Sequence, residues 1–344
     1  AVSPTATAAP PTIHRTIYTA AEQNILPGQR IRGEGDAPTG DAAIDEAYDG
    51  AGATYALFKE AYGRSSIDGQ GMPINSTVHY HKGYDNAFWN GNQMVYGDGD
   101  EDLPENQRLF NRFTIAIDII GHELTHGVTQ FSAGLVYQDQ AGALNESMSD
   151  IFGSLVKQRQ SGETAVDADW LIGEGIFTAN VNATALRSLK APGTAYDDPV
   201  VGKDPQPAHM DHYVHTEHDH GGVHINSGIP NHAFYLMATE MGGFAWEKAG
   251  QIWYTALQRK LNARATFQEA ADVTHQIAAD MYGVNSAEQQ AVHNGWMGVG
   301  IEPAPIVPPV PTPSPPEPPT PSPPPPDDTP QGCRPSLKSL LLFW

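Results

Sequence analysis

The chain has 344 residues, 40% of them hydrophobic, and a formal net charge of −21. Such a negative charge argues against binding to nucleic acid or to anionic membranes, because both need basic surface patches. No apolar run reaches the roughly 20 residues that span a membrane. The length suits two domains with substantial cores, and acidic clusters of this kind can hold calcium.

Cysteine content and the N-terminal residues bear on the compartment. Cys333 is the only cysteine, so neither an intrachain disulfide framework nor a cysteine-based zinc site is expected. The first residues lack the basic region and apolar core of a signal peptide. A processed, secreted chain would begin in this way, and so would a cytoplasmic protein. We expect a secreted monomer and keep the cytoplasm as the alternative.

The first part of the chain mixes strand and helix patterns. Residues 1–14 are rich in Ala, Pro and Thr, and we expect them to be poorly ordered. Apolar residues at helical spacing predict a helix over residues 41–62, with Asp41 as its N-cap. Short strand-like runs such as residues 76–80 follow, separated by Gly and Asn turns. We therefore predict a β-rich N-terminal domain over residues 15–133, which ends in a helix.

That helix carries the sequence Gly-His-Glu-Leu-Thr-His at residues 121–126. Residues four apart lie on one helix face, so His122 and His126 can bind one metal ion together. Glu123 would lie close to a metal-bound water without being a ligand. His-Glu-x-x-His on a helix is a zinc-hydrolase signature. The alternative is a helix with two ordinary histidines and an exposed glutamate.

A second segment supplies acidic residues at helical spacing. Residues 145–160 read as a helix that stops at Ser161-Gly162, with Glu146 and Asp150 on one face. Two histidines and one glutamate form a recognised catalytic zinc set, which leaves a position for water. Asp150 could accept the other N–H of a zinc-bound histidine. The alternative reading is a solvated acidic helix face.

From residue 134 to 301 the pattern is mainly helical. Pro230 lies near a helix start, and residues 246–261 are amphipathic. Capping boxes are predicted at Thr266–Glu269 and at Ser286–Gln289. The predicted fold is therefore α+β with two domains, a β-rich N-terminal domain and a mainly α-helical C-terminal one. The zinc helix would run between them and place the site in the cleft.

Residues 302–344 form a Pro-rich tail, which we expect to be disordered and extended like a polyproline II linker. An SH3-type ligand role is an alternative. The apolar end of the tail would either dock on another surface or be a remnant.

Several motifs together resemble the thermolysin-like zinc metalloproteases, over residues 15 to 301. The residues around Asn24 to Gly28 look closest to the protealysin-like branch of that family. The motifs that carry the resemblance are, in chain order, Asn86-Ala87-Phe88-Trp89, His122-Glu123-x-x-His126, Gly134-Leu135-Val136-Tyr137, Asn145-Glu146 and Gly222-Val223-His224-Ile225-Asn226.

The resemblance implies a zinc endopeptidase mechanism. One catalytic zinc would be held by His122, His126 and Glu146, with Asp150 behind them. Glu123 would act as the general base. Tyr137 and His224 would stabilise the oxyanion that forms on the substrate, and Asp219 would orient the His224 ring. The crowded histidines around His224 could instead be a surface metal site, and Tyr137 could be a half-buried core residue.

The resemblance also implies substrate contacts. Asn86 and Ala87 would bind the substrate backbone, and Arg187 would meet a substrate carbonyl. An apolar pocket would receive the residue after the cut bond, which implies cleavage on the N-terminal side of bulky apolar residues. Its lining would be Phe110, Phe113, Ile119 and Leu186.

The chain departs from the family at its paired calcium site. Asp118, Asp169 and Glu174 match acidic residues of that site. Lys157 stands where a bridging carboxylate is expected, and Leu171 replaces another acidic residue. Since Ca²⁺ takes about six to eight oxygen ligands, we hypothesise that the Lys157 ammonium replaces one cation and that at most one calcium binds.

Two other functions compete with an endopeptidase acting on proteins or peptides. An aminopeptidase with the same zinc motif would carry a segment that marks the substrate N-terminus. Asn86-Ala87-Phe88-Trp89 occupies that edge instead and favours internal cleavage. A non-catalytic binding protein on the same fold would need neither Glu123 nor Tyr137.

Overall fold

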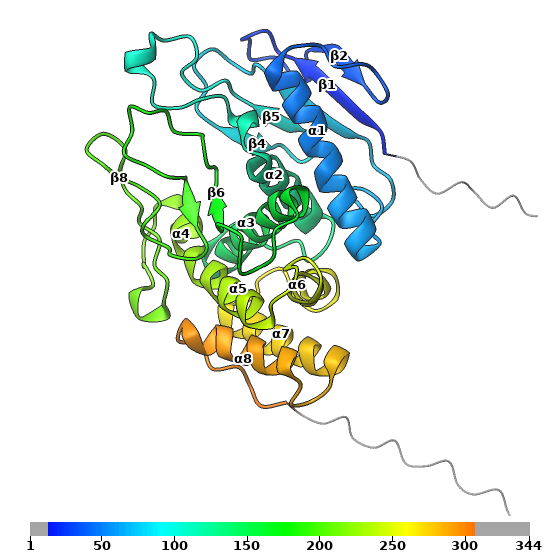
Figure 1. Ribbon diagram of the computed structural model, residues 1–344, viewed down its shortest axis with the longest axis vertical. Coiled ribbons are helices and arrows are strands. Elements are labelled where there is room, and N and C mark those ends of the chain that lie inside the picture. The colour runs from blue at the N-terminus through cyan, green and yellow to red at the C-terminus, as the bar shows by residue number, and fades with distance from the viewer. Residues whose placement is uncertain (1–12, 307–344) are drawn as a thin grey trace, which may run out of the picture. The chain divides into compact units, whose positions relative to one another are not determined.

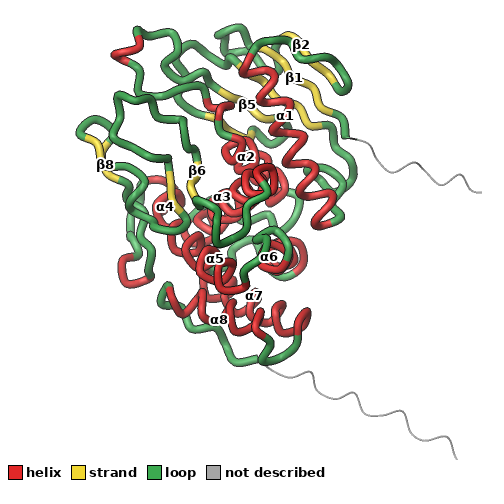
Figure 2. The backbone as a smooth tube through the Cα atoms, viewed as in Figure 1, coloured by secondary structure: helices red, strands yellow, loops and turns green. Residues whose placement is uncertain are grey.

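The computed structural model describes residues 13–306. Residues 1–12, which make up most of the N-terminal stretch predicted to be poorly ordered, lie outside the described residues. Cys333 and the Pro-rich tail from residue 307 onward also lie outside them. Figure 2 shows the larger group of strands in the N-terminal half and most of the helices in the C-terminal half, so the α+β fold class is confirmed. Among the helices of residues 13–306, none is long and apolar enough to cross a membrane.

The N-terminal half contains a five-stranded sheet in the order β2-β1-β3-β5-β4. β1 pairs antiparallel with β2 and parallel with β3, and the short edge strand β4 pairs antiparallel with β5. The predicted strand at residues 76–80 is β3, shifted two residues toward the N-terminus. The strands are β1 Arg15–Thr19, β2 Gln29–Gly33, β3 Ile74–Val78, β4 Ala87–Trp89 and β5 Met94–Tyr96.

Helix α1 (Ala42–Ala56) packs on β1 and β3 and contacts the helix α2 (Ile117–Gln130) (Figure 1). Asp41 is its N-cap as predicted, and its side chain accepts a hydrogen bond of 3.2 Å from the Ile44 N–H. The predicted helix continues to Ala61, but Leu57–Ala61 is wound as a wider π-helix.

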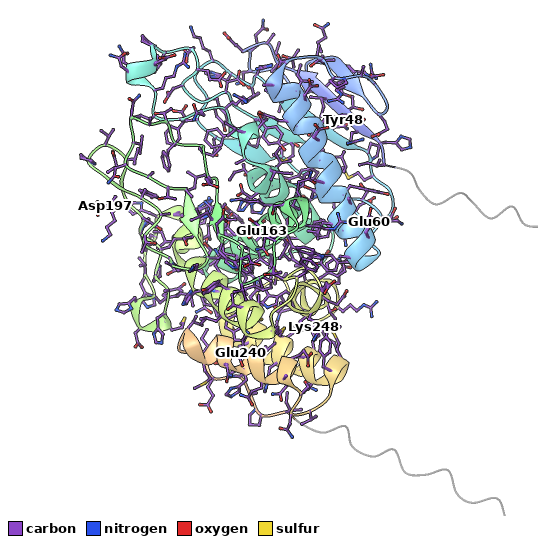
Figure 3. All side chains as sticks on the ribbon, viewed as in Figure 1. Tyr48, Glu60, Glu163, Asp197, Glu240 and Lys248 are labelled. Atoms are coloured by element: carbon purple, nitrogen blue, oxygen red, sulfur yellow. The ribbon has the colours of Figure 1, made fainter. Side chains whose placement is uncertain are left out.

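Two arginines of the sheet stack on a buried tyrosine of α1 and tie the helix to the sheet. Tyr48, labelled in Figure 3, lies between the guanidinium groups of Arg15 and Arg32, each 3.7 Å from the ring centre. Arg15 also pairs with Glu34 at 2.6 Å. These contacts fix α1 against β1 and β2, and α1 in turn supports α2.

Helix α3 (Asp139–Ser161) lies against α2, and every residue from 141 to 156 is buried. Close approach of the two helices requires glycine, because a Cβ at Gly153 would lie 2.4 Å from the carbonyl oxygen of Asp118. The helix stops at Ser161-Gly162 as predicted, and Gly162 adopts the left-handed conformation. Its start, however, lies six residues before the predicted Asn145.

The C-terminal half consists mainly of helices, and all but the last of them contact α3 (Figure 1). The capping box at Thr266 is confirmed. Ser286 caps its helix as predicted, but the Gln289 side chain accepts from Asn285 N–H instead of closing the box, so that half of the prediction is wrong. The amide nitrogen of Gln289 contacts Nε2 of His275. The helices are α4 Asp219–Asn226, α5 Gly228–Met241, α6 Lys248–Arg259, α7 Phe267–Tyr282 and α8 Ala287–Gly298.

Residues between α3 and α4 form mostly loops. β6 (Leu171–Ile172) pairs with β7 (Arg187–Ser188), and β8 (Asp197–Asp198) pairs with β9 (Gly202–Lys203). Short 3-10 turns are found at Glu105–Gln107, Phe113–Ile115 and Met210–His212.

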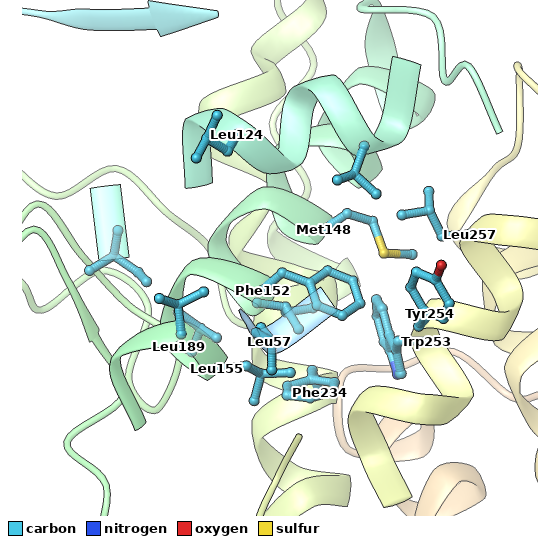
Figure 4. Close-up of a cluster of buried hydrophobic side chains, with 14 of the residues drawn as sticks. Leu57, Leu124, Met148, Phe152, Leu155, Leu189, Phe234, Trp253, Tyr254 and Leu257 are labelled. Atoms are coloured by element: carbon cyan, nitrogen blue, oxygen red, sulfur yellow. The ribbon is translucent and has the colours of Figure 1, made fainter. Parts of the chain in front are cut away.

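One hydrophobic core runs through both halves. Figure 4 shows Met148, Phe152 and Leu155 of α3 facing Trp253 and Tyr254 of α6, within the same cluster as Leu57. The ring of Phe152 lies 5.3 Å from that of Phe58 and 6.3 Å from that of Tyr254. Because the core is shared, the two walls of the cleft are held on one rigid support.

Candidate active site

His122 and His126 face each other on α2. Their Nε2 atoms are 3.1 Å apart. Each Nδ1 already has a partner, because His122 bonds Asp150 at 2.8 Å and His126 bonds Asn145 at 2.9 Å. The Asn145 amide donates to the Leu135 carbonyl, so its oxygen accepts from His126. Both outer nitrogens are therefore donors to the protein, which leaves the two Nε2 atoms to bind a metal.

Glu146 completes the group from α3. Its carboxylate is 1% exposed, with Oε2 3.4 Å from His122 Nε2 and Oε1 3.5 Å from His126 Nε2. Oε2 is buried and has no hydrogen-bond partner. Among residues 13–306, His122, His126 and Glu146 are the only group of three such residues whose ligand atoms all lie within 4.8 Å of one another. A buried, unpartnered carboxylate oxygen beside two imidazole nitrogens fits zinc.

The electrostatics of this group also favour a cation. Burial disfavours the charged ring of His122, but the carboxylates of Asp150 and Glu146 outweigh it and raise its pKa to about 10. Burial lowers the pKa of His126 to about 4. Burial opposes ionisation of Glu146, yet the surrounding histidines hold its pKa well below the usual range. The site thus keeps its carboxylate ionised and attracts positive charge.

Glu123 lies beside these three residues on the cleft side of α2. Its Oε2 accepts a hydrogen bond of 3.1 Å from the Trp89 N–H of β4. Burial raises the pKa of Glu123 to about 7. A carboxyl group with a pKa near neutrality is suited to taking and returning a proton.

The opposite wall of the site presents Tyr137 and His224. The Tyr137 hydroxyl is hydrogen-bonded to Glu146 and lies 3.1 Å from His224 Nε2. Asp219 accepts from both the backbone N–H and Nδ1 of His224, at 2.9 and 2.6 Å. Four successive residues with positive φ, 219–222, turn the chain so that this carboxylate reaches the ring. Tyr137 is 37% exposed, so it is a cleft residue and not part of the core.

Asp150 lies behind His122 and is fully buried. Arg187 of β7 binds both of its oxygens, with Nη2 2.7 Å from Oδ1 and Nε 2.8 Å from Oδ2. Asn231 of α5 donates to Oδ2 at 2.8 Å. Burial opposes the charge of Asp150, but Arg187 and His122 keep its pKa well below the usual range. Arg187 therefore supports the site and also lines the cleft.

A cavity of about 890 Å³ opens over the site. The predicted substrate residues all line it, with β4 contributing one edge and the apolar side chains lying beside Arg187. These residues are Asn86, Ala87, Phe110, Phe113, Ile119, Leu186 and Arg187.

Sequence reasoning missed two supporting amides, Asn145 and Asn231. Asn145 had a usable signal, because the second zinc histidine also needs a partner for Nδ1 and Asn145 directly precedes Glu146. Asn231 had none, since 81 residues separate it from Asp150.

The predicted calcium residues surround an ammonium group. Lys157 Nζ lies 2.7 Å from Asp169, 3.4 Å from Glu174 and 3.7 Å from Asp118. Burial raises the pKa of Asp118 to about 6, against the opposing effect of Lys157. Leu171 contributes only its backbone N–H, which donates to Asp169 at 2.9 Å.

The fold and the site together define a zinc metallopeptidase. The family model for the thermolysin metallopeptidase catalytic domain matches residues 12–130, and that for the alpha-helical domain matches residues 133–301. The chain belongs to the thermolysin family and is a zinc metalloendopeptidase. The aminopeptidase and non-catalytic readings are therefore not favoured.

Relatives and a solved structure agree. The chain is 51% identical over 290 residues to an extracellular metalloprotease of Pectobacterium carotovorum subsp. carotovorum, covering 84% of this chain and 81% of that protein. It is 41% identical to a thermolysin of Alicyclobacillus acidocaldarius subsp. acidocaldarius, covering 83% of this chain and 50% of that protein. The structure of the precursor of protealysin from Serratia proteamaculans matches with a TM-score of 0.81 at 53% identity, covering 86% and 90% of the two chains. These findings support the protealysin branch.

Proposed function

We propose that this endopeptidase cleaves proteins and peptides on the N-terminal side of bulky apolar residues. The observation that carries the proposal is the apolar pocket of Phe110, Phe113, Ile119 and Leu186, which shares one cavity with Glu123 and the zinc-binding group. A bulky apolar side chain in that pocket would be removed from water, which favours its binding.

His122, His126 and Glu146 would hold the zinc through the two Nε2 atoms and the Glu146 carboxylate. Zinc bound there would lower the pKa of a water molecule and polarise the substrate carbonyl. Glu123 takes the proton of the attacking water and delivers it to the leaving amine. The Trp89 N–H fixes one oxygen of that carboxylate and leaves the other to accept the proton.

Tyr137 and His224 donate to the oxygen that becomes negatively charged in the transition state. Asp219 accepts a hydrogen bond from His224 Nδ1 and holds the ring with Nε2 toward the cleft. Because Nδ1 carries a proton for Asp219, Nε2 donates to the substrate oxygen only from a ring that carries a proton on both nitrogens. The Tyr137 hydroxyl, bonded to Glu146 and His224 in the free enzyme, turns to the substrate oxygen.

The substrate backbone lies along the edge strand β4, where Asn86 and Ala87 bind it. Arg187 donates to a substrate carbonyl on the side of the apolar pocket while its Nε and Nη2 remain on Asp150.

The test is hydrolysis of casein and of a peptide series that varies only in the residue after the cut bond. We expect kcat/KM to be highest for Leu and Phe, and activity to be lost in Glu123→Gln and with a zinc chelator. Glu163→Gln is the control and should keep full activity, because Glu163, labelled in Figure 3, does not line the cleft. Activity that survives both Glu123→Gln and chelation would refute the mechanism, and equal rates for all peptides would refute the specificity.

We also propose that the Lys157 ammonium is the structural cation among Asp118, Asp169 and Glu174, so that at most one calcium binds there. Its distances of 2.7 to 3.7 Å to three carboxylates support this. Calorimetric titration that finds two tight calcium sites would refute it.

We further propose that the enzyme is a secreted monomer, with domains at residues 15–133 and 134–301. The Pectobacterium relative is named an extracellular metalloprotease, which supports secretion, and the alternative is the cytoplasm. Mass spectrometry of the native enzyme in medium and in cells, with its mass in solution, tests both points.

A further inference from the structure

Asn231 occupies an unusual position in the first turn of α5. It is fully buried, and its side-chain amide donates 2.8 Å to Asp150 Oδ2. The other oxygen of the same carboxylate bonds His122 Nδ1 at 2.8 Å. A single neutral side chain therefore contacts the residue that holds a zinc-binding histidine.

The geometry around Asp150 gives Asn231 a specific task. Arg187 Nε is 3.1 Å from Oδ1 and 2.8 Å from Oδ2, so the guanidinium contacts both oxygens. Asn231 approaches Oδ2 from a different element, α5. Two partners from two elements hold the carboxylate plane, and that plane determines where the His122 ring points. We propose that Asn231 is a positioning residue for the zinc site, acting on His122 through Asp150.

The cost of keeping an amide here argues against a purely structural role. The Asn231 Oδ1 atom is buried and has no hydrogen-bond partner. A buried, unpaired carbonyl oxygen destabilises the folded state, whereas an apolar side chain of similar volume would not. The Asn231 side chain therefore uses its N–H donor on Asp150, while its carbonyl oxygen makes no hydrogen bond.

The local backbone explains how α5 comes so close. A Cβ at Gly228 would lie 2.7 Å from the Pro207 carbonyl oxygen, so only glycine allows this approach. The Asn231 N–H bonds the Ser227 carbonyl at 3.0 Å, and Ser227 Oγ donates to the His224 carbonyl at 3.0 Å. The first turn of α5 thus connects the His224 segment to Asp150, the residue that holds His122.

The inference rests on the proposed zinc site, and zinc affinity is its direct readout. In a Glu123→Gln background, which prevents self-cleavage, we would measure the zinc dissociation constant by competition with a chelating fluorophore. Asn231→Leu should weaken zinc binding about tenfold, since loss of a group that supports a metal ligand typically costs 10- to 100-fold. In the active background at saturating zinc, kcat should fall while KM stays within twofold.

Gln158→Leu is the matched control. Gln158 is a buried amide of α3 whose oxygen also lacks a partner, and it contacts Ser154 instead of Asp150. Its zinc affinity should equal that of the parent even if its melting temperature changes. If Asn231→Leu does not fold, Asn231→Ser carries the same expectation, because its shorter hydroxyl removes the amide donor.

Two results separate the hypotheses. Zinc affinity of the Asn231 variant within twofold of the parent, or a loss no larger than that of Gln158→Leu, overturns the inference alone. A parent enzyme that binds no zinc overturns the proposed function together with it.

Discussion

Replacing Lys157 with methionine should destabilise the enzyme, because it leaves three carboxylates without their cation. Asp118 is the critical one, since it is 1% exposed and lies 3.7 Å from the Lys157 ammonium. Methionine keeps the length and the apolar stem of lysine and removes only the charge. Lys157→Asp should lose stability as well, and should then regain it when calcium is added.

The magnitude follows from the distance. Two unit charges 3.7 Å apart interact by about 4 kcal/mol at an effective dielectric constant of about 20. Lys157 retains 21% exposure, and Asp118 can take up a proton, so we expect a loss of about 2–3 kcal/mol in the free energy of unfolding. At about 2 °C per kcal/mol for a large domain, the melting temperature should fall by about 4–6 °C.

The assay is thermal unfolding in the Glu123→Gln background, at one scan rate, with calcium or with a calcium-selective chelator. Arg159→Met is the control, because Arg159 lies on α3 like Lys157 and pairs with the exposed Glu60. Loss of this surface ion pair should lower the free energy of unfolding by less than about 1 kcal/mol. A Lys157→Met variant as stable as Arg159→Met, or Lys157→Asp unaffected by calcium, would show that the ammonium does not act as the structural cation.

Three further outcomes are expected. His224→Ala should lower kcat by about 100- to 1000-fold with little change in KM, since the donor acts in the transition state, and a change confined to KM in steady-state kinetics would contradict this. Leu186→Phe narrows the apolar pocket and should reduce kcat/KM for Phe substrates by about tenfold relative to Leu substrates; an unchanged ratio would remove this residue from the pocket. Hydrogen bonding to Asp98, with the further charge of Asp41, raises the pKa of His79, so its stabilising contribution is complete below about pH 6.5 and is lost as pH rises through the folded-state pKa. The stability difference between wild type and His79→Gln should therefore shrink from pH 6 to pH 9 in denaturant titrations, and a difference that grows would reverse the sign of the argument.

Sequence spacing was sufficient for the elements whose signals are local. His122 and His126 lie one helical turn apart, and Glu146 and Asp150 repeat that spacing, so the metal-binding group was predictable. The start of α3 was not, because Gly142 resembles a helix breaker. A Cβ there would lie 2.4 Å from Val223, so the glycine serves helix packing, which only the fold reveals.

Contacts between distant segments account for the rest. Arg187 and Asn231 meet Asp150 across 37 and 81 residues, and neither residue type nor spacing indicates such a meeting. The Ser286 capping box failed because the Gln289 oxygen accepts from the Asn285 N–H, while its amide nitrogen contacts His275 of another helix. Local sequence patterns thus predict the zinc-binding residues better than they predict the distant residues that position them.

The burial of α3 should protect this helix from autolysis by other copies of the enzyme. Residues 141–156 have no exposed segment, so a protease can reach them only after global unfolding. Residues 163–209 contain only two-residue strands, and Val166 and Val200 there are 69% and 72% exposed. Autolysis should therefore begin in this loop region, and mass spectrometry of the first fragments should place the nick there while Glu146 remains in an intact helix.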